Sequence, residues 1–191
     1  NLVNANLLKA ELEAYGSIFQ TTMDTEIIIH LLAISRTHSL VERIGDALNR
    51  VKGAYCLLFL TETRMIAVRD PHGFRPLCLG KLGDAWVVAS ESCALDLIEA
   101  KFVREVEPGE MLIFTKDGQM QSLFPFKKIE PTPCIFEFVY FARPDSNIFG
   151  RNVYQVRKEL GRQLAREYQV EADVVIAVPD SGVPAAMGYA E

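Results

Sequence analysis

The sequence predicts an α+β layered domain that is followed by the beginning of an α/β domain. Three helical segments come first, and a series of short strand-like runs joined by turn residues follows them. Helices followed by consecutive hairpins are typical of α+β layers rather than of a parallel sheet. The pattern changes again after Pro131–Pro133, where a long amphipathic helix and a further strand are predicted. We therefore expect two domains, at residues 1–130 and 131–191.

The three helices of the first domain are predicted from apolar residues that recur every three or four positions. They lie around Leu7–Gly16, from Thr22–Asp24 to Ile34, and from Ser39 to Gly53. The third helix has the clearest start, because Glu42 stands three residues after Ser39 and completes a capping-box pattern. Gly53 is of the residue type that most often ends a helix.

The period then changes to that of strands. Strands are predicted at residues 54–60, 65–68, 77–79, 86–89, 111–114 and 119–124. The second domain contains an apolar run at Cys134–Phe141, a helix at Val153–Tyr168, and a strand at Val174–Val178 that runs into Pro179–Gly182 and a small-residue helix. Strand, polar loop and helix together form the opening of an α/β phosphate site. So few elements do not complete an α/β sheet, so we expect this domain to be truncated.

The composition argues against several classes of partner. The 191 residues carry a net charge of -5, which gives no long-range attraction to nucleic acid or to anionic lipid. No apolar run approaches the roughly 20 residues of a membrane helix, and no basic segment opens the chain. The four cysteines show neither zinc-site spacing nor the density of a disulfide scaffold. We expect a cytoplasmic protein that binds small molecules, with no nucleic-acid or membrane partner.

Two motifs of the first domain resemble those of glutamine amidotransferases with an N-terminal nucleophile. Gln20–Glu26 is similar to their glutamine-binding stretch, and Val68–Leu77 is similar to their strand-turn-strand signature. Glucosamine-6-phosphate synthase and asparagine synthetase share both motifs, so these identify only the superfamily. The resemblance implies a four-layer α/β/β/α glutaminase domain, incomplete in this chain.

A third motif narrows the family. Cys134–Ser146 closely resembles the entry to the phosphoribosyltransferase domain of the phosphoribosylpyrophosphate amidotransferases, and Val178–Gly182 with Pro184–Ala190 is similar to the same family further on. The resemblance covers essentially the whole chain. It implies that residues 131–191 begin an α/β type I phosphoribosyltransferase domain.

The family implies a mechanism with two sites. In one half, an amino-terminal Cys attacks the amide of glutamine, with its own α-amino group as base and an Asn-Gly pair stabilising the oxyanion. In the other half, ammonia displaces pyrophosphate from Mg-bound 5-phosphoribosyl 1-pyrophosphate, which gives 5-phosphoribosylamine in the first step of de novo purine synthesis. The resemblance also implies a homo-oligomer that purine nucleotides inhibit.

The catalytic residues of that mechanism are missing from this sequence. The chain begins with Asn1, so none of its cysteines combines a thiol with a free α-amine. The His-Asn-Gly triplet and the acidic pair of the phosphoribosylpyrophosphate signature are absent as well. We therefore assign no catalytic residue, and we expect the chain to be an internal fragment that is inactive on its own.

Asp24 is the best candidate for binding substrate. A carboxylate at a helix start can hold the α-ammonium group of glutamine through a charge-assisted hydrogen bond. Capping the helix is the alternative use of an Asp in this position, and the two roles are compatible. The resemblance favours binding.

Cys134 and Ser181 are the candidates for metal binding. Cys134 resembles the first ligand of a [4Fe-4S] cluster found in one branch of the family, whose other cysteines lie further along the chain. Other members carry this Cys without a cluster, so a cluster in the parent protein is left open, and none is expected in this chain. Ser181 resembles the residue that helps hold Mg²⁺ or a phosphate, and an N-cap is its alternative role. Asp180 is a weaker candidate beside Ser181.

The remaining motif residues have structural explanations. Arg69, Asp70, Arg75 and Asp145 are expected to form ion pairs or to cap turns.

Two rival functions stay open. One is the glutaminase part of a glucosamine-6-phosphate synthase-like enzyme, which has no reason to carry the Cys134–Ser146 motif. The other is a non-catalytic scaffold that kept the fold.

Overall fold

The computed structural model describes all residues from Asn1 to Glu191, and these form two compact units. Unit 1 comprises Asn1–Phe74, Glu107–Thr115 and Gln119–Pro131, and unit 2 comprises Arg75–Val106, Lys116–Gly118 and Thr132–Glu191. The predicted second domain, residues 131–191, thus lies almost wholly in unit 2, together with residues 75–106. The boundary near residue 130 stays a prediction.

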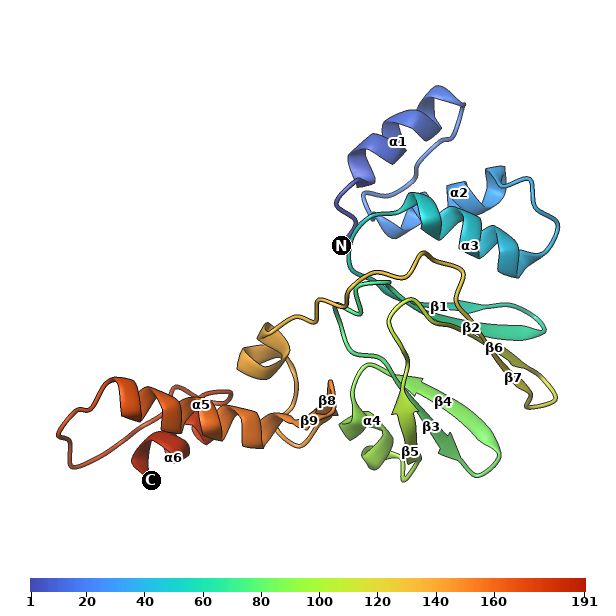
Figure 1. The fold of residues 1–191 in the computed structure, drawn as a ribbon. Coiled ribbons are helices and arrows are strands. Elements are labelled where there is room, and N and C mark those ends of the chain that lie inside the picture. Colours follow the sequence, from blue (N-terminus) through green and yellow to red (C-terminus); the bar gives the residue numbers. More distant parts are fainter. The chain divides into compact units, whose positions relative to one another are not determined.

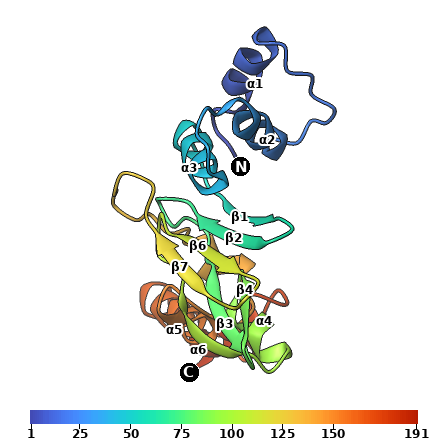
Figure 2. The same cartoon turned by 90° about the vertical axis from the view of Figure 1, so that its right-hand side faces the viewer.

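Unit 1 places three helices over an antiparallel sheet. Its elements are α1 (Ala5–Ala14), α2 (Thr25–Ile34), α3 (Leu40–Arg50), β1 (Cys56–Leu60), β2 (Arg64–Arg69), β6 (Met111–Thr115) and β7 (Met120–Leu123). The strand order is β1-β2-β6-β7, and every pair is antiparallel. Both views show the helices on one side of this sheet (Figure 1, Figure 2). These elements confirm the predicted helices and four of the predicted strands.

The core of unit 1 lies between the helices and that sheet. Leu12, Leu31 and Leu48 come from the three helices, and Ile66 and Met111 come from the central strands, and all five are at most 1% exposed. Alternate residues of a strand face the same side, which brings one apolar row of β2 and β6 under the helices. The capping box predicted for α3 is also present, since Glu42 N donates to Ser39 Oγ and Ser39 N donates to Glu42 Oε2.

Unit 2 begins with a second antiparallel sheet. It consists of β3 (Cys78–Leu82), β4 (Ala85–Ala89) and β5 (Lys101–Glu105) in the order β4-β3-β5, and the short helix α4 (Ser92–Leu97) connects β4 to β5. Leu95 of α4 packs with Cys78 and Ala100 in a small core. The predicted strands at 77–79 and 86–89 are confirmed, whereas β5 was not predicted.

The rest of unit 2 consists of helices, one small hairpin and the irregular segment between α5 and α6. It contains the π-helix η1 (Glu137–Phe141), the hairpin strands β8 (Asn147–Ile148) and β9 (Arg151–Asn152), and the helices α5 (Val153–Glu167) and α6 (Val183–Ala190). Phe138, Ile148 and Val153 are buried together and join η1, the hairpin and α5. None of the helices in the chain is both long enough and apolar enough to cross a membrane.

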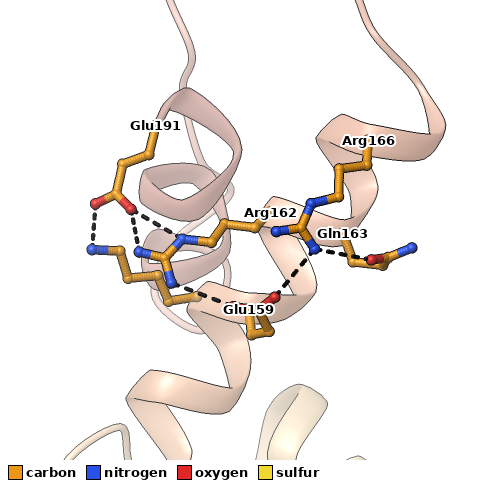
Figure 3. A network of polar contacts seen from close by, with 6 residues as sticks. Glu159, Arg162, Gln163, Arg166 and Glu191 are labelled. Atoms are coloured by element: carbon orange, nitrogen blue, oxygen red, sulfur yellow. Dashed lines mark hydrogen bonds and ion pairs between the residues drawn. The ribbon is translucent and has the colours of Figure 1, made fainter.

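Helices α5 and α6 pack closely against each other (Figure 1). A Cβ placed on Gly161 would overlap the backbone of Ala185, and one placed on Gly188 would overlap the backbone of Lys158, so the two helices touch through their main chains. At the surface, Glu191 pairs with Lys158 and Arg162, and Glu159 pairs with Arg162 and Arg166 (Figure 3). Such exposed pairs contribute only about 0–1 kcal/mol each, so the glycine contacts dominate.

The predicted strand at Val174–Val178 is wrong. The segment has no strand hydrogen bonds, and Val174, Ile176 and Val178 are 72%, 86% and 84% exposed. A strand needs a neighbouring backbone to pair with, and none of the three sheets extends to this segment. The small-residue helix predicted after it is confirmed as α6.

Candidate functional site

The Gln20–Glu26 motif is a loop organised by the carboxylate of Glu26. Gln20 N donates to Glu26 Oε1 at 2.8 Å, and Thr21 N and Thr21 Oγ1 donate to Glu26 Oε2 at 2.9 and 2.6 Å. These donors favour the charged form. The hydrogen bond from Gln20 N is the largest cause that lowers the pKa of Glu26 to about 2, followed by the hydroxyl of Thr21. The loop is therefore held by an ionised glutamate.

This arrangement predicts a pH dependence for the loop. A carboxylate whose pKa is lowered on folding stabilises the folded loop above pH 4.5, its ordinary pKa, and that stabilisation disappears as the pH falls toward about 2. We expect the NMR amide signals of Gln20 and Thr21 to stay constant down to about pH 3 and to shift with a midpoint near 2. Glu26→Gln should abolish this transition. A midpoint near 4.5 in the wild type would show that the carboxylate does not hold the loop.

Asp24 is the N-cap residue of α2. Its side chain makes no hydrogen bond to the first turn of the helix, so the side-chain capping given as its alternative role is not formed. Instead, Leu2 N donates to Asp24 Oδ2 at 2.9 Å. The side chain is only half-buried, and its Oδ1 has no protein partner. One carboxylate oxygen thus fixes the first residues of the chain, and the other is open to a cationic ligand.

The first residues of the chain, whose Leu2 N donates to Asp24, are also hydrogen-bonded to the residues directly before β1. Val3 N donates to Lys52 O, and Ala54 N donates to Asn1 O. Gly53 has a φ of +134° at this crossing, and a Cβ there would overlap Asn1 O. Only glycine fits such a close backbone approach. Asp24 is therefore part of a junction in which the first residues of the chain are hydrogen-bonded both to its side chain and to the residues before β1.

A surface hollow of about 380 Å³ lies between α2 and β1. It is lined by Thr21, Met23, Thr25, Glu26, Ile28, Ile29, Leu57, Leu58 and Phe59. Most of these side chains are apolar, and Asp24 is not among them. An amino acid substrate carries two charges that need polar partners, so the hollow does not suit glutamine.

The Val68–Leu77 motif has a structural role around Asp70, as expected. Asp70 is fully buried, and its carboxylate accepts hydrogen bonds from Tyr55 N, His72 N and Phe74 N. Burial raises the pKa of Asp70, and these donors oppose the rise. Arg69 donates to Gly73 O at 3.1 Å and closes the same turn.

The last residues of that motif contact the Cys134–Ser146 motif within unit 2. Arg75 Nε lies 2.6 Å from Glu137 Oε1, and the Arg75 guanidinium stacks over the ring of Phe141 at 4.4 Å. Glu137 is buried. Burial raises its pKa, while the charge of Arg75 opposes this and the charge of the neighbouring Glu91 adds to it. The ion pair expected for Arg75 is confirmed, and it joins two motifs that lie about sixty residues apart in the sequence.

The Cys134–Ser146 motif forms the π-helix and the loop after it. The buried Arg157 of α5 donates from Nε to Phe138 O at 2.6 Å and from Nη2 to Ala142 O at 2.8 Å. In the loop, Arg143 and Asp145 form the expected ion pair with two hydrogen bonds of 3.1 and 2.7 Å. π-Helical turns occur often at functional sites, and here one is fixed by a charged side chain from another helix.

Cys134 stands at the entrance of this π-helix with a half-buried side chain. The other three cysteines are Cys56 in β1, Cys78 in β3 and Cys93 in α4. Burial raises the pKa of the Cys93 thiol. No three His, Cys, Asp or Glu side chains of the chain lie together as metal ligands.

Ser181 lies directly before α6, with a half-buried side chain. The N-cap of α6 is Gly182, so Ser181 does not have its alternative capping role. Val183 N already donates to Asp180 O, and Pro184 has no N–H. One hydroxyl group does not form a complete metal site. Mg²⁺ commonly takes only one or two ligands from the protein and completes its coordination with water and phosphate oxygens, so Ser181 can supply one such ligand.

The comparisons with known proteins agree with this geometry. The sequence model of the glutamine amidotransferase domain matches residues 1–97, which include the Asp24 loop and the Asp70 turn. The chain therefore belongs to the glutamine amidotransferase domain family.

Over its whole length the chain is also similar to amidophosphoribosyltransferases. It is 53% identical to the enzyme of Bacillus subtilis and 56% identical to amidophosphoribosyltransferase 1, chloroplastic, of Arabidopsis thaliana. It covers 40% and 34% of those two proteins, so it spans about a third to two fifths of their length.

Solved structures give the same result for the fold. One is the glutamine phosphoribosylpyrophosphate amidotransferase of Bacillus subtilis complexed with ADP and GMP, with a TM-score of 0.96, 54% identity, and 42% of its chain covered. Another is described as the allosteric regulatory enzyme of purine biosynthesis, with a TM-score of 0.97, 54% identity and 41% coverage. Both matches cover all of the present chain, so the predicted glutaminase fold is confirmed.

Proposed function

We propose that the full-length protein carrying this chain is a glutamine-dependent amidophosphoribosyltransferase. It transfers the amide nitrogen of glutamine to 5-phosphoribosyl 1-pyrophosphate and forms 5-phosphoribosylamine, glutamate and pyrophosphate, the first step of de novo purine synthesis. The observation that carries this proposal is the identity of more than half over the whole chain with named amidophosphoribosyltransferases. That similarity continues through Cys134–Ser146, beyond the residues 1–97 shared by amidotransferases in general.

In the glutamine half, Asp24 is proposed to bind the α-ammonium group of glutamine through Oδ1. Its Oδ2 is occupied by Leu2 N, which fixes the orientation of the carboxylate. Charge-assisted hydrogen bonds of this kind are short and about twice as strong as neutral ones. The apolar hollow between α2 and β1 is left out of this site.

In the ribose-phosphate half, residues 131–191 are proposed to begin a type I phosphoribosyltransferase domain. Ser181 would supply one hydroxyl to Mg²⁺ or to a phosphate of the bound substrate. Cys134 would supply one thiolate to a [4Fe-4S] cluster only if three cysteines outside residues 1–191 complete the set.

Purine nucleotides are proposed as inhibitors, because one similar structure contains ADP and GMP. The homo-oligomer and the cytoplasmic location stay predictions.

Replacing Asp24 tests the glutamine half. Asp24→Asn in the full-length protein keeps an oxygen for Leu2 N but removes the negative charge that faces the ligand. We expect the KM for glutamine to rise about tenfold to a hundredfold, as for the loss of a hydrogen bond to a charged group, with little change in ammonia-dependent activity. The exposed Asp46 of α3 offers the matched control, Asp46→Asn, which should leave both activities unchanged. An equal loss of both activities in Asp24→Asn would contradict the binding role.

A further inference from the structure

The carboxylate of Glu91 collects several hydrogen bonds at the start of α4. Arg143 N and Ser146 Oγ each donate to Glu91 Oε2 at 2.8 Å, and the thiol of Cys93 lies 3.7 Å from the same oxygen. The next residue, Ser92, accepts a hydrogen bond from Asn147 N at 2.8 Å. We call this set of residues, Glu91, Ser92, Arg143, Ser146 and Asn147, the Glu91 clasp.

The clasp joins two parts of the sequence that belong to different half-reactions. Glu91 and Ser92 lie within residues 1–97, which match the glutamine amidotransferase domain. Arg143, Ser146 and Asn147 lie more than fifty residues later, in and directly after the motif that is specific to the amidophosphoribosyltransferases. All five residues are in unit 2. The clasp is thus a direct polar connection from the nitrogen-donor part to the start of the acceptor part.

The surroundings make this connection hard to replace. Ser146 and Ser92 are buried, at 0% and 5% exposure. If Glu91 were removed, Ser146 Oγ and Arg143 N would lose the carboxylate oxygen that accepts their hydrogen bonds, and the loss of an acceptor is destabilising for a buried donor such as Ser146 Oγ. The ion pair between Arg75 and Glu137 lies nearby, and the buried Arg157 contacts the same loop through Ala142 O. These side chains hold the π-helix, and the hydrogen bonds of the clasp hold the Arg143–Asn147 loop to the start of α4.

We propose that Glu91 is a positioning residue that keeps the donor and acceptor halves in register during nitrogen transfer. The inference rests on the proposed function. Ammonia released from glutamine is small, is readily protonated and exchanges with water, so its delivery depends on a fixed junction between the two halves. A loosened Arg143–Asn147 loop would release ammonia to solvent while each half keeps its own chemistry.

The test uses the full-length protein with Glu91→Ala, the conservative Glu91→Gln, and Glu171→Gln as a matched control at an exposed glutamate. The first readout is the ratio of phosphoribosylamine formed to glutamate released. We expect a ratio near one in the wild type and in the control, a fall of at least about threefold in Glu91→Ala, and partial rescue in Glu91→Gln, which keeps an acceptor oxygen. Ammonia-dependent synthesis should stay within about twofold of the wild type in every variant.

A second readout does not depend on activity. Hydrogen exchange at the amides of Arg143 and Asn147 should become at least about tenfold faster in Glu91→Ala, because their acceptors are lost or displaced. Unchanged exchange together with an unchanged ratio would overturn the inference. If Glu91→Ala does not fold, Ser146→Ala decides the matter, because it removes one bond of the clasp without leaving a buried charge and should lower the ratio by a smaller factor. A wild type that forms no phosphoribosylamine contradicts the proposed function, while the exchange data still decide whether Glu91 holds the loop.

Discussion

Gly188→Ala is expected to separate α6 from α5. A Cβ at this position would overlap the carbonyl oxygen of Lys158, which is main chain and cannot rotate away. Helix propensity alone favours alanine over glycine by about 1 kcal/mol. Overpacking that forces backbone to shift costs typically about 1–3 kcal/mol, and an overlap with main chain lies at the upper end of this range, so the clash should prevail. We expect a net loss of about 1–2 kcal/mol in the stability of unit 2 after the propensity gain is subtracted, measured by urea unfolding with hydrogen exchange at α5 and α6.

Gly45→Ala in α3 provides the matched control for this substitution. Gly45 is also inside a helix, but a Cβ there would lie 3.3 Å from the Cβ of Pro125, a contact that a shift of a few tenths of an ångström relieves. This variant should stay within about 1 kcal/mol of the wild type. Gly161→Ala should behave like Gly188→Ala, because its Cβ would overlap the backbone of Ala185. A stable, wild-type-like Gly188→Ala protein would show that α5 and α6 do not touch through their main chains.

Arg157→Leu should destabilise the chain by about 3–4 kcal/mol. The substitution removes two charge-assisted hydrogen bonds, to Phe138 O and Ala142 O, each worth about 1.5–3 kcal/mol. Arg157 is 2% exposed, so water does not readily replace the lost donors. The leucine recovers part of the loss through apolar burial. Chemical denaturation followed by signals from η1 and α5 measures the effect.

Arg166→Leu on the same helix is the control for Arg157→Leu. Its side chain is 64% exposed and interacts with Glu159 and Gln163 at the surface. Exposed pairs of this kind contribute about 0–1 kcal/mol, so the expected change is within about 0.5 kcal/mol. Equal effects for the two arginines would mean that the buried guanidinium does not hold the π-helix.

The parts of the fold that sequence could predict are those set by local pattern. The amphipathic period of α3 and the Ser39–Glu42 capping box depend on residues within one turn of each other, and both are confirmed. β5 was missed because three of its five residues are exposed, which leaves no buried row to produce an alternation. The opposite error occurred at Val174–Val178, where strong strand propensity has no partner strand among the described residues.

The candidate site could be predicted only in part, because most of its contacts join residues that lie far apart in the sequence. Asp24 could be selected from its motif, but its bond to Leu2 N joins residues 22 positions apart and has no sequence signal. The π-helix was predicted only as an apolar run, because its geometry depends on Arg157 from α5. Glu91 was missed altogether. The only available signal was its place in Ser90–Cys93 before a helix, and its partners are more than fifty residues away.

We propose that the full-length protein carrying this chain moves nitrogen from glutamine to an activated ribose phosphate. The most direct measurement supplies the full-length protein with glutamine labelled with ¹⁵N at the amide, together with 5-phosphoribosyl 1-pyrophosphate and fructose 6-phosphate. We expect ¹⁵N on carbon 1 of the ribose phosphate, with one pyrophosphate released for each labelled amine and no label on the hexose. Label on the hexose phosphate, or on neither sugar, would contradict it.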